Sequence, residues 1–506
     1  MARMWIRTLS IVVAAVAATS MVPVRGDDES DYVWQSDGDV RPVGVIQPDA
    51  PKDLTTALIA EARFGPTARQ TASGLPKGFA VQEQTSSAAG TKRGNPFKEE
   101  APPAKPPAAA SAVPGTAAAV SSDACTVCED DCDGEPYRLF KLPALEDSRI
   151  GLRGWLEQGY TWNPDRPANR FNGPVAFNDR SNEYQLNQLY LIAERVAKPG
   201  KRTPELGGRV DFLYGTDHRF VTASGLDDDW SGSARFYGLA MPQLYGDLAF
   251  QKLLFRAGHF YAPCGYETAM AEDNFFYSHS YTFLYAQPTS LTGAQLQCQL
   301  NDRLSVNGGL DTGWNAWEPT NGKLGYFTGV NWTSPDKRTS LAFELFLNNR
   351  QPAGIESTLT HYALVLRSKL SDKLSYGFEH NLGYDPEAVQ TQFGRTHGEW
   401  YSFVHYLIYE LNPCWSVGVR YEWLNDDDGL VVQGLGDPHG IPLSPVPAAW
   451  NELSLGVNYK PSNNLVLRSE VRWDWENTWV PAIAQPFDDF TKSRQFLWAT
   501  DLIVRF

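Results

Sequence analysis

The stretch FYSHSY contains Ser278, His279 and Ser280, and His259 lies close to it in the sequence. A serine hydroxyl activated by an imidazole base is the pair that covalent hydrolases of the lipase and protease type use. No nucleophile-elbow pattern surrounds these serines, and adjacent polar residues in an aromatic segment more often form local hydrogen bonds. We therefore expect no catalytic residues, and a hydrolase is kept as the alternative.

Two acidic runs could hold a cation, DDDW at 227–230 and DDDG at 426–429. Clustered carboxylates are the ligands that Ca²⁺ prefers, but neither run has the spacing of an EF-hand loop. Both runs stand among Gly and Pro residues that are typical of connecting loops. We expect solvated loop tips, no metal site and no cofactor.

The most numerous charged residues alternate with apolar ones. In NNLVLRSEVRWDWE (463–476) one parity is apolar with two tryptophans, and the other parity is charged. A period of two places the two sets on opposite faces of a β-strand. The charged face is predicted to line a wet interior, with Glu344 and the following candidate pore-lining residues: Arg367, Lys369, Glu379, Arg420, Glu422, Arg468, Glu470, Arg472, Asp474, Asp501 and Arg505.

Such alternating segments recur from about residue 148 to the last residue, and we count about sixteen. Tight turns such as 301–303 and 461–464 alternate with long loops such as 426–449. This organisation is typical of a transmembrane antiparallel β-barrel. The predicted strands are 149–162, 183–197, 206–217, 236–250, 253–262, 285–300, 303–314, 324–334, 339–349, 359–371, 373–385, 398–412, 413–425, 450–461, 463–476 and 493–506.

The region before residue 148 has a different composition. In residues 1–26, Arg3 and Arg7 precede an apolar run that ends in small residues, which predicts a secretory signal peptide. Residues 27–147 include the Pro/Ala-rich stretch 101–122 and are expected to form a largely disordered periplasmic extension. The net charge of −15 argues against nucleic acid as a partner.

The extension ends in a small cysteine cluster, Cys125, Cys128 and Cys132. A metal centre would need a fourth ligand, and the acidic neighbours disfavour anionic thiolates, so a disulfide between two of the three is the simpler expectation for an exported chain. The other cysteines are expected to be isolated or to form one pair, without a redox role: Cys264, Cys298 and Cys414.

The strands near the C-terminus favour a barrel over a soluble β-rich binding protein. Phe496, Trp498, Leu502, Val504 and Phe506 share one face, with Thr500 as the single polar exception. Trp and Tyr are frequent in the whole chain, and they concentrate where an apolar surface meets water at a membrane interface. The fold class is therefore an all-β transmembrane barrel, with a soluble exported module and an outer-membrane barrel enzyme as alternatives.

Three stretches resemble the OmpL-like outer-membrane β-barrel porin family: residues 154–191, 207–220 and 257–283. The resemblance covers residues 148–506 and implies a water-filled channel for ions and small hydrophilic solutes, with no catalytic residues. It also implies outer-membrane lipids as surroundings and Phe506 as a signal for the barrel assembly machinery. A homotrimer is compatible with it.

The stretch 263–284, between the fifth and sixth predicted strands, is long and unusually aromatic. So many aromatic side chains need a surface to pack against, and the barrel wall is the nearest one. General porins fold the loop at this place into the lumen, which the resemblance makes a reasonable analogy. The residues expected to narrow the channel are Glu267, Glu272, Asp273 and His279, and the alternative is a cap or a contact between barrels.

Overall fold

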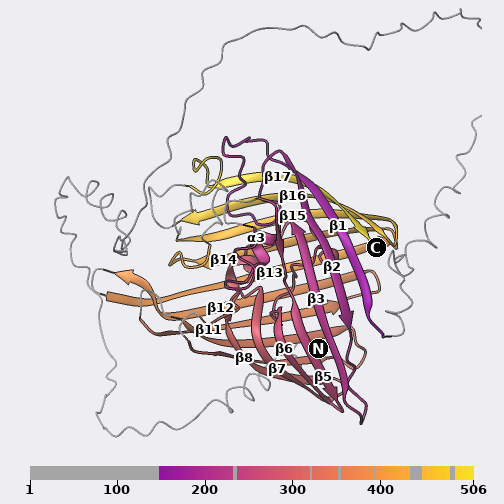
Figure 1. Cartoon of the computed structure of the whole chain (residues 1–506). Helices are drawn as coiled ribbons and strands as arrows, with labels where there is room; N and C mark the ends of the chain where they lie inside the picture. The colour runs from indigo at the N-terminus through magenta and orange to yellow at the C-terminus, as the bar shows by residue number, and fades with distance from the viewer. Residues whose placement is uncertain are drawn as a thin grey trace, which may run out of the picture. The chain divides into compact units, whose positions relative to one another are not determined.

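The computed structural model describes residues 148–231, 236–319, 322–350, 355–391, 394–432, 447–478 and 485–506. These residues form one antiparallel sheet that closes on itself, because β1 pairs with β17 (Figure 1). The predicted signal peptide, the extension 27–147 and its cysteine cluster lie outside the described residues.

The sheet contains seventeen strand segments. They are β1 (Gly151–Trp162), β2 (Glu183–Arg195), β3 (Glu205–Gly215), β4 (Gly238–Ala240), β5 (Leu244–Phe250), β6 (Leu253–Tyr261), β7 (Ser290–Asn301), β8 (Leu304–Trp314), β9 (Gly325–Thr333), β10 (Thr339–Arg350), β11 (Ser357–Lys369), β12 (Leu374–Thr391), β13 (Gly394–Asn412), β14 (Trp415–Asp426), β15 (Ala448–Ser462), β16 (Leu465–Thr478) and β17 (Arg494–Arg505).

β4 and β5 together make a single crossing, since β4 pairs with one end of β3 and β5 with the other. The barrel therefore has sixteen crossings, which confirms the predicted fold class. The interruption at 241–243 falls in the predicted strand 236–250 and contains Pro242, which has no N–H for a ladder hydrogen bond.

The two ends of the barrel differ in their connections. At one end, here the short-turn end, two residues join neighbouring strands at 251–252, 302–303, 413–414 and 463–464. At the other, the long-loop end, the connections include 163–182 and 262–289. β1 starts and β17 finishes at the short-turn end, where the register pairs Trp155 with Arg505.

The two faces of each strand follow the predicted alternation. On β16, Arg468, Glu470 and Arg472 are buried, whereas Leu467 and Trp473 are exposed on the outer face. Apolar side chains on the outer face of a barrel meet lipid, so the inner face holds the charged set. No helix among the described residues is long and apolar enough to cross a membrane.

β12 and β13 differ from the prediction, which ended them near residues 385 and 398. They pair as far as Thr391 and Gly394 and extend past their neighbours at the long-loop end (Figure 1). A register shift after Asp385 marks the point where this outer hairpin begins. The barrel encloses three short helical turns, α3 (His218–Val221), η3 (Ala271–Asp273) and η4 (Thr282–Ala286).

Candidate functional site: the lumen and its inner loop

Residues 262–289 connect β6 to β7, and we call this segment the inner loop. Its aromatic side chains pack against the inner face of the barrel wall. Tyr266 stacks on Tyr406 with ring centroids 4.0 Å apart, and Phe276 and Tyr277 are buried. The segment therefore occupies the lumen, and its aromatic surface is covered within one barrel.

Inward-facing glycines make room for these rings. A Cβ on Gly377 would lie 2.3 Å from the Tyr266 ring, and a Cβ on Gly418 would lie 2.5 Å from the Phe275 ring. Any larger residue at these strand positions would displace the inner loop. Burial of one such aromatic side chain stabilises the packed arrangement by about 2 kcal/mol.

Strand glutamates hold the backbone N–H groups of the inner loop. The Glu422 carboxylate accepts hydrogen bonds from the N–H groups of Tyr281 and Thr282, both at 2.6 Å. Glu470 accepts in the same way from Tyr277 and Ser278, both at 3.1 Å. Hydrogen bonds to a charged acceptor are stronger than neutral ones, so each carboxylate fixes two consecutive peptide units.

Strand arginines hold the carbonyl groups of the same segment. Arg468 donates to the carbonyl oxygens of Ala271, Asn274 and Phe276 at 2.9–3.0 Å. The same guanidinium forms ion pairs with Asp501 and, at 2.7 Å, with Glu157. The register places Arg468 directly opposite Asp501 on the neighbouring strand, and this ion pair orients the guanidinium towards the loop carbonyls.

Arg472 and Asp474 act as a second unit on β16. Arg472 donates to the His279 carbonyl at 2.6 Å and pairs with Asp474 at 2.7 Å. Asp474 in turn accepts a hydrogen bond from the Tyr281 hydroxyl at 2.7 Å. Both side chains come from the same strand, and each of them bonds to the inner loop.

Arg420 is the centre of the contact between the inner loop and the wall. It forms ion pairs with Glu267 of the loop at 2.6 Å and with Glu452 of β15 at 2.5 Å, and it also donates to the Ser278 carbonyl at 2.7 Å. Burial would raise the pKa of Glu267, but Arg420 and His279 beside it lower that pKa to about 2. Glu267 therefore stays ionised at neutral pH.

The Ser-His cluster has no catalytic geometry. Nδ1 of His279 lies 3.3 Å from Glu267, and the ring packs against both Phe177 and Phe283. Burial lowers the pKa of His279, which keeps the imidazole neutral. Among the described residues, no serine hydroxyl is hydrogen-bonded to a ring nitrogen of His279, and Ser278 and Ser280 contact Arg420 and Glu267 instead.

The tip of the inner loop reaches the short-turn end. Glu272 forms ion pairs with Arg153 at 2.5 Å and with Arg505 at 3.3 Å, near the start of β1 and the end of β17. Asp273 lies beside Glu272, and burial raises the pKa of both carboxyl groups. The loop thus descends through most of the length of the lumen.

The eleven candidate lining residues fall into three groups. Eight are buried, and they bond to the inner loop or to one another: Glu379, Arg420, Glu422, Arg468, Glu470, Arg472, Asp474 and Asp501. Arg505 is half-buried, whereas Arg367 and Lys369 are exposed near the short-turn end of β11. Arg367 donates to the carbonyls of Gly265 and Tyr266, while Glu379 accepts from the Tyr266 N–H at 2.7 Å.

The sequence signal for this arrangement was incomplete. Alternation predicts that these side chains face inward, but it does not say that a segment of backbone lies over them. The inward glycines, such as Gly377 and Gly418, were the available sign of that segment, because an inner face without side chains invites close packing.

The inner loop is hydrogen-bonded to only part of the wall, although Ala262 and Cys264 pack against the apolar cluster that includes Phe327 and Phe346. In the described part of the chain, no hydrogen bond or ion pair joins residues 263–289 to β8, β9 or β10. A cavity of about 460 Å³ lies on this side, between the inner loop and β9–β11. Its wall side is formed by Asn331, Ala342, Glu344, Ala363, Val365 and Arg367.

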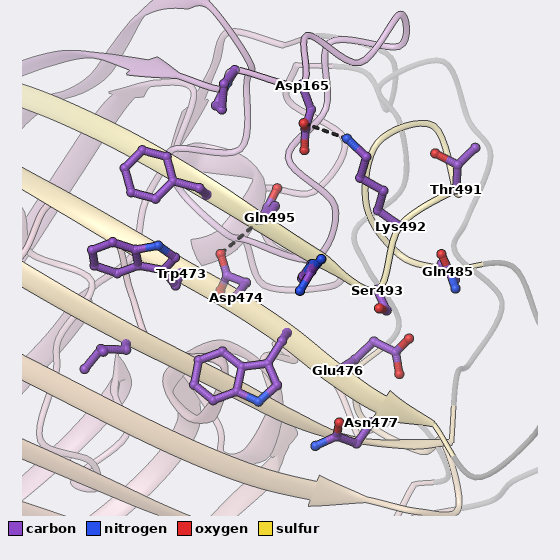
Figure 2. Close-up of a pocket in the computed structure, with 15 residues that line it drawn as sticks. Asp165, Trp473, Asp474, Glu476, Asn477, Gln485, Thr491, Lys492, Ser493 and Gln495 are labelled. Atoms are coloured by element: carbon purple, nitrogen blue, oxygen red, sulfur yellow. Dashed lines mark hydrogen bonds and ion pairs between the residues drawn. The ribbon is translucent and has the colours of Figure 1, made fainter.

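A larger hollow of about 1000 Å³ lies at the long-loop end, beside β16 and β17. Figure 2 shows its upper edge closed by an ion pair between Asp165 and Lys492, while Gln495 bonds to Asp474 further in. Trp473 and Phe496, which are on the outer face of their strands, also line it. This hollow is therefore lined by residues from both faces of β16 and β17.

The acidic runs are not, as predicted, solvated along their whole length, because the first aspartate of each run, Asp227 and Asp426, is buried. Asp227 accepts hydrogen bonds from the backbone N–H groups of Ala223 and Met241. Asp426 accepts from three consecutive N–H groups, those of residues 430–432. The first aspartate of DDDG and the first of DDDW are thus committed to backbone donors.

The cysteines correct one expectation. Cys264 and Cys298 carry free thiols, but Cys414 is disulfide-bonded, so the three are neither all isolated nor joined as a pair among themselves. The partner of Cys414 lies outside the described residues. The prediction for Cys125, Cys128 and Cys132 also falls outside them.

A closed sixteen-crossing barrel with a charged inner face, an apolar outer face and a loop folded into its lumen is a porin-like outer-membrane channel fold. The family model described as "Putative beta-barrel porin-2, OmpL-like" matches residues 149–506, and the chain belongs to this family. The resemblance inferred from the sequence is thereby confirmed.

Solved porins and channels have similar folds at low sequence identity. The outer membrane channel DcaP of Acinetobacter baumannii is 13% identical, with a TM-score of 0.49 over 71% of this chain and 97% of that chain. The anion-selective porin from Comamonas acidovorans is 9% identical, with a TM-score of 0.48, and the match covers 71% of this chain and 99% of that porin. Pseudomonas putida OprB is 10% identical, with a TM-score of 0.45, and the match covers 72% of this chain and 96% of OprB. No curated protein sequence matches the chain.

Proposed function

We propose that the protein is a channel through which ions and small hydrophilic solutes diffuse across the outer membrane, with the inner loop as its constriction. The observation that carries this proposal is the one-sided attachment of the loop. Arg420, Glu422, Arg468 and Glu470 bind its backbone on one side. The cavity of about 460 Å³ on the other side supports a passage along β9–β11.

The selectivity that we propose is a weak preference for cations that fades with salt. The charges of Arg420, Arg468 and Arg472 are balanced by carboxylates within 4 Å and contribute little net field. Glu344 and Asp273 face the cavity, and acidic residues such as Asp228 and Asp427 stand in the long loops. A ring of carboxylates favours cations in a pore.

The experiment is conductance in planar bilayers with a deletion of residues 268–280. If the inner loop narrows the channel, the wild type gives discrete steps, and the deletion raises the step size and admits larger sugars. The matched control removes residues 388–397 from the outer hairpin of β12 and β13, which should leave the step size unchanged. A correctly folded wild-type barrel that never conducts would contradict the proposal.

We also propose that Phe506 is the assembly signal for the barrel assembly machinery. The Phe506 N–H donates to the Gly154 carbonyl, and the Gly154 N–H donates to the Phe506 carbonyl, both at 2.9 Å, so the last residue completes the closing ladder. Truncation of Phe506 should impair insertion in cells far more than refolding in detergent. Equal defects in both assays would leave the residue with a packing role only.

The placement of the remaining parts follows from the barrel ends. Because both ends of the barrel chain lie at the short-turn end, we propose that residues 27–147 are periplasmic after removal of residues 1–26. Outer-membrane lipids surround the apolar face, and small hydrophilic solutes pass the lumen. A homotrimer is the proposed assembly, and cross-linking in native membranes would test it.

A further inference from the structure

Two side-chain hydrogen bonds, which we call polar rungs, join β8 to β10 across a glycine of β9. In the first, Asn307 donates to Glu344 at 2.6 Å across Gly329. In the second, Asn348 donates to Asp311 at 2.7 Å across Gly325. A Cβ on Gly329 would lie 2.1 Å from the Glu344 carboxylate, so only a glycine leaves room for the carboxylate at this position. All of these side chains face the lumen.

The first rung has acceptor oxygens without donors. Glu344 is only 2% exposed, yet nothing donates to its Oε2, and the Oδ1 of Asn307 is also without a partner. Among the described residues, no lysine or arginine forms an ion pair with Glu344. Glu422 and Glu470, across the lumen, use both carboxylate oxygens on backbone N–H groups of the inner loop.

The cavity beside Glu344 has a mixed surface. Ala342, Ala363 and Val365 make its wall side apolar, and Asn331 adds an amide. Arg367 also lines the cavity, but its guanidinium is engaged with carbonyls of the inner loop and lies over the Tyr266 ring. A buried carboxylate next to apolar side chains therefore remains available to a cationic ligand.

We propose that Glu344 is the anionic ligand of a binding subsite for the primary ammonium group of a small organic amine passing through the lumen. An ammonium group has three N–H donors and can bond the free Oε2 of Glu344 and the amide oxygen of Asn331, which also lines the cavity, while its alkyl part packs on Ala342, Ala363 and Val365. Ca²⁺ requires six to eight oxygen ligands, more than this rung offers. The inference rests on the proposed function, since the amine reaches Glu344 through the channel.

The test compares reversal potentials in methylammonium chloride gradients for the wild type and Glu344→Gln. The amide keeps an acceptor for Asn307 and nearly the same volume, so the barrel should fold, as heat-modifiable migration would verify. We expect the methylammonium-to-chloride permeability ratio to fall by about fivefold in E344Q. Glu344→Asp keeps the charge and should retain most of the preference, and Glu410→Gln, exposed near the short-turn end of β13, should behave as the wild type.

The outcomes separate the two proposals. A wild type without conductance in KCl would overturn the channel itself. A wild type and E344Q that both conduct in KCl with identical methylammonium selectivity would overturn the ammonium subsite and leave the channel intact. That result would mean that the Glu344 carboxyl carries no charge that the permeating amine meets.

Discussion

The wall formed by β11–β17, β1 and β2 differs from the wall formed by β8–β10 in where its polar side chains find partners. On the first, which we call the clamp wall, Arg420, Arg468 and Glu422 bind the backbone of the inner loop. On the second, the free wall, Asn307 and Glu344 bond only to each other across the strands. Similar inward-facing residues thus hold a constriction on one side and remain available to solutes on the other.

The difference teaches that an inward charge is not in itself a pore-lining charge. A strand residue reaches solute only where no other segment of the chain has taken its hydrogen-bonding capacity. Buried charges that lose their partner are costly, because desolvation is no longer compensated. Substitutions on the clamp wall should therefore affect stability, and those on the free wall should affect permeation.

The largest effect is expected from Arg420→Met. The substitution removes the arginine partner of the buried Glu267 and leaves Glu452 with only the longer contact to Arg472 at 3.8 Å, which should lower the unfolding free energy by about 3–5 kcal/mol. Urea titration of the refolded barrel would measure it. Arg367→Met is the matched control, because Arg367 is exposed and bonds only to carbonyls, and a loss as large as that of R420M would contradict the comparison.

A smaller effect is expected from Glu422→Gln. The amide retains one acceptor but directs an NH₂ group at the N–H of Tyr281 or Thr282, at a cost of about 1–3 kcal/mol. Amide hydrogen exchange of residues 277–283 should become faster, while exchange in β8–β10 stays as in the wild type. Unchanged protection of the inner loop would show that Glu422 does not hold it.

Acidification should loosen the inner loop in two steps. Burial lowers the pKa of His279 from its usual 6.5. Below pH 6.5 this histidine therefore takes up a proton more readily in the unfolded chain than in the folded loop, and the folded loop loses stability. The pKa of Glu267 is lowered from 4.5 to about 2, so its stabilisation is complete above pH 4.5 and is lost between pH 4.5 and 2. Current noise should rise as the pH falls, and His279→Asn should remove the step that begins near 6.5.

The smallest effect is expected on the free wall. Asp311→Asn should change the unfolding free energy by no more than about 1 kcal/mol, because the Asp311 carboxylate forms no ion pair among the described residues and the amide oxygen still accepts from Asn348 and from the Gly313 N–H. The same urea titration would measure it. Destabilisation comparable to that of R420M would mean that the two walls do not differ.

The strands of the barrel could largely be predicted from alternation. The hydrogen bonds between the clamp wall and the inner loop could not. The period of two identifies Arg468 and Asp501 as inward, and strand pairing then brings them together. The contact between Glu422 and Tyr281 depends on the path of a loop far away in the sequence, which no local pattern encodes. Pro242 and the inward Gly418 do mark the strand interruption and the close approach of the loop in the sequence, whereas the disulfide of Cys414 has no local signal.

The most direct test of the two-wall account is thiol accessibility in an open channel. Asn331→Cys and Ser454→Cys place one thiol on each wall, both inward-facing, with Cys264 and Cys298 replaced by serine. Asn331 lines the cavity, while Ser454 is fully buried beside Arg420. A water-soluble cationic methanethiosulfonate reagent should reduce the current through N331C and leave S454C unaffected. Block of S454C with an unreactive N331C would contradict the account.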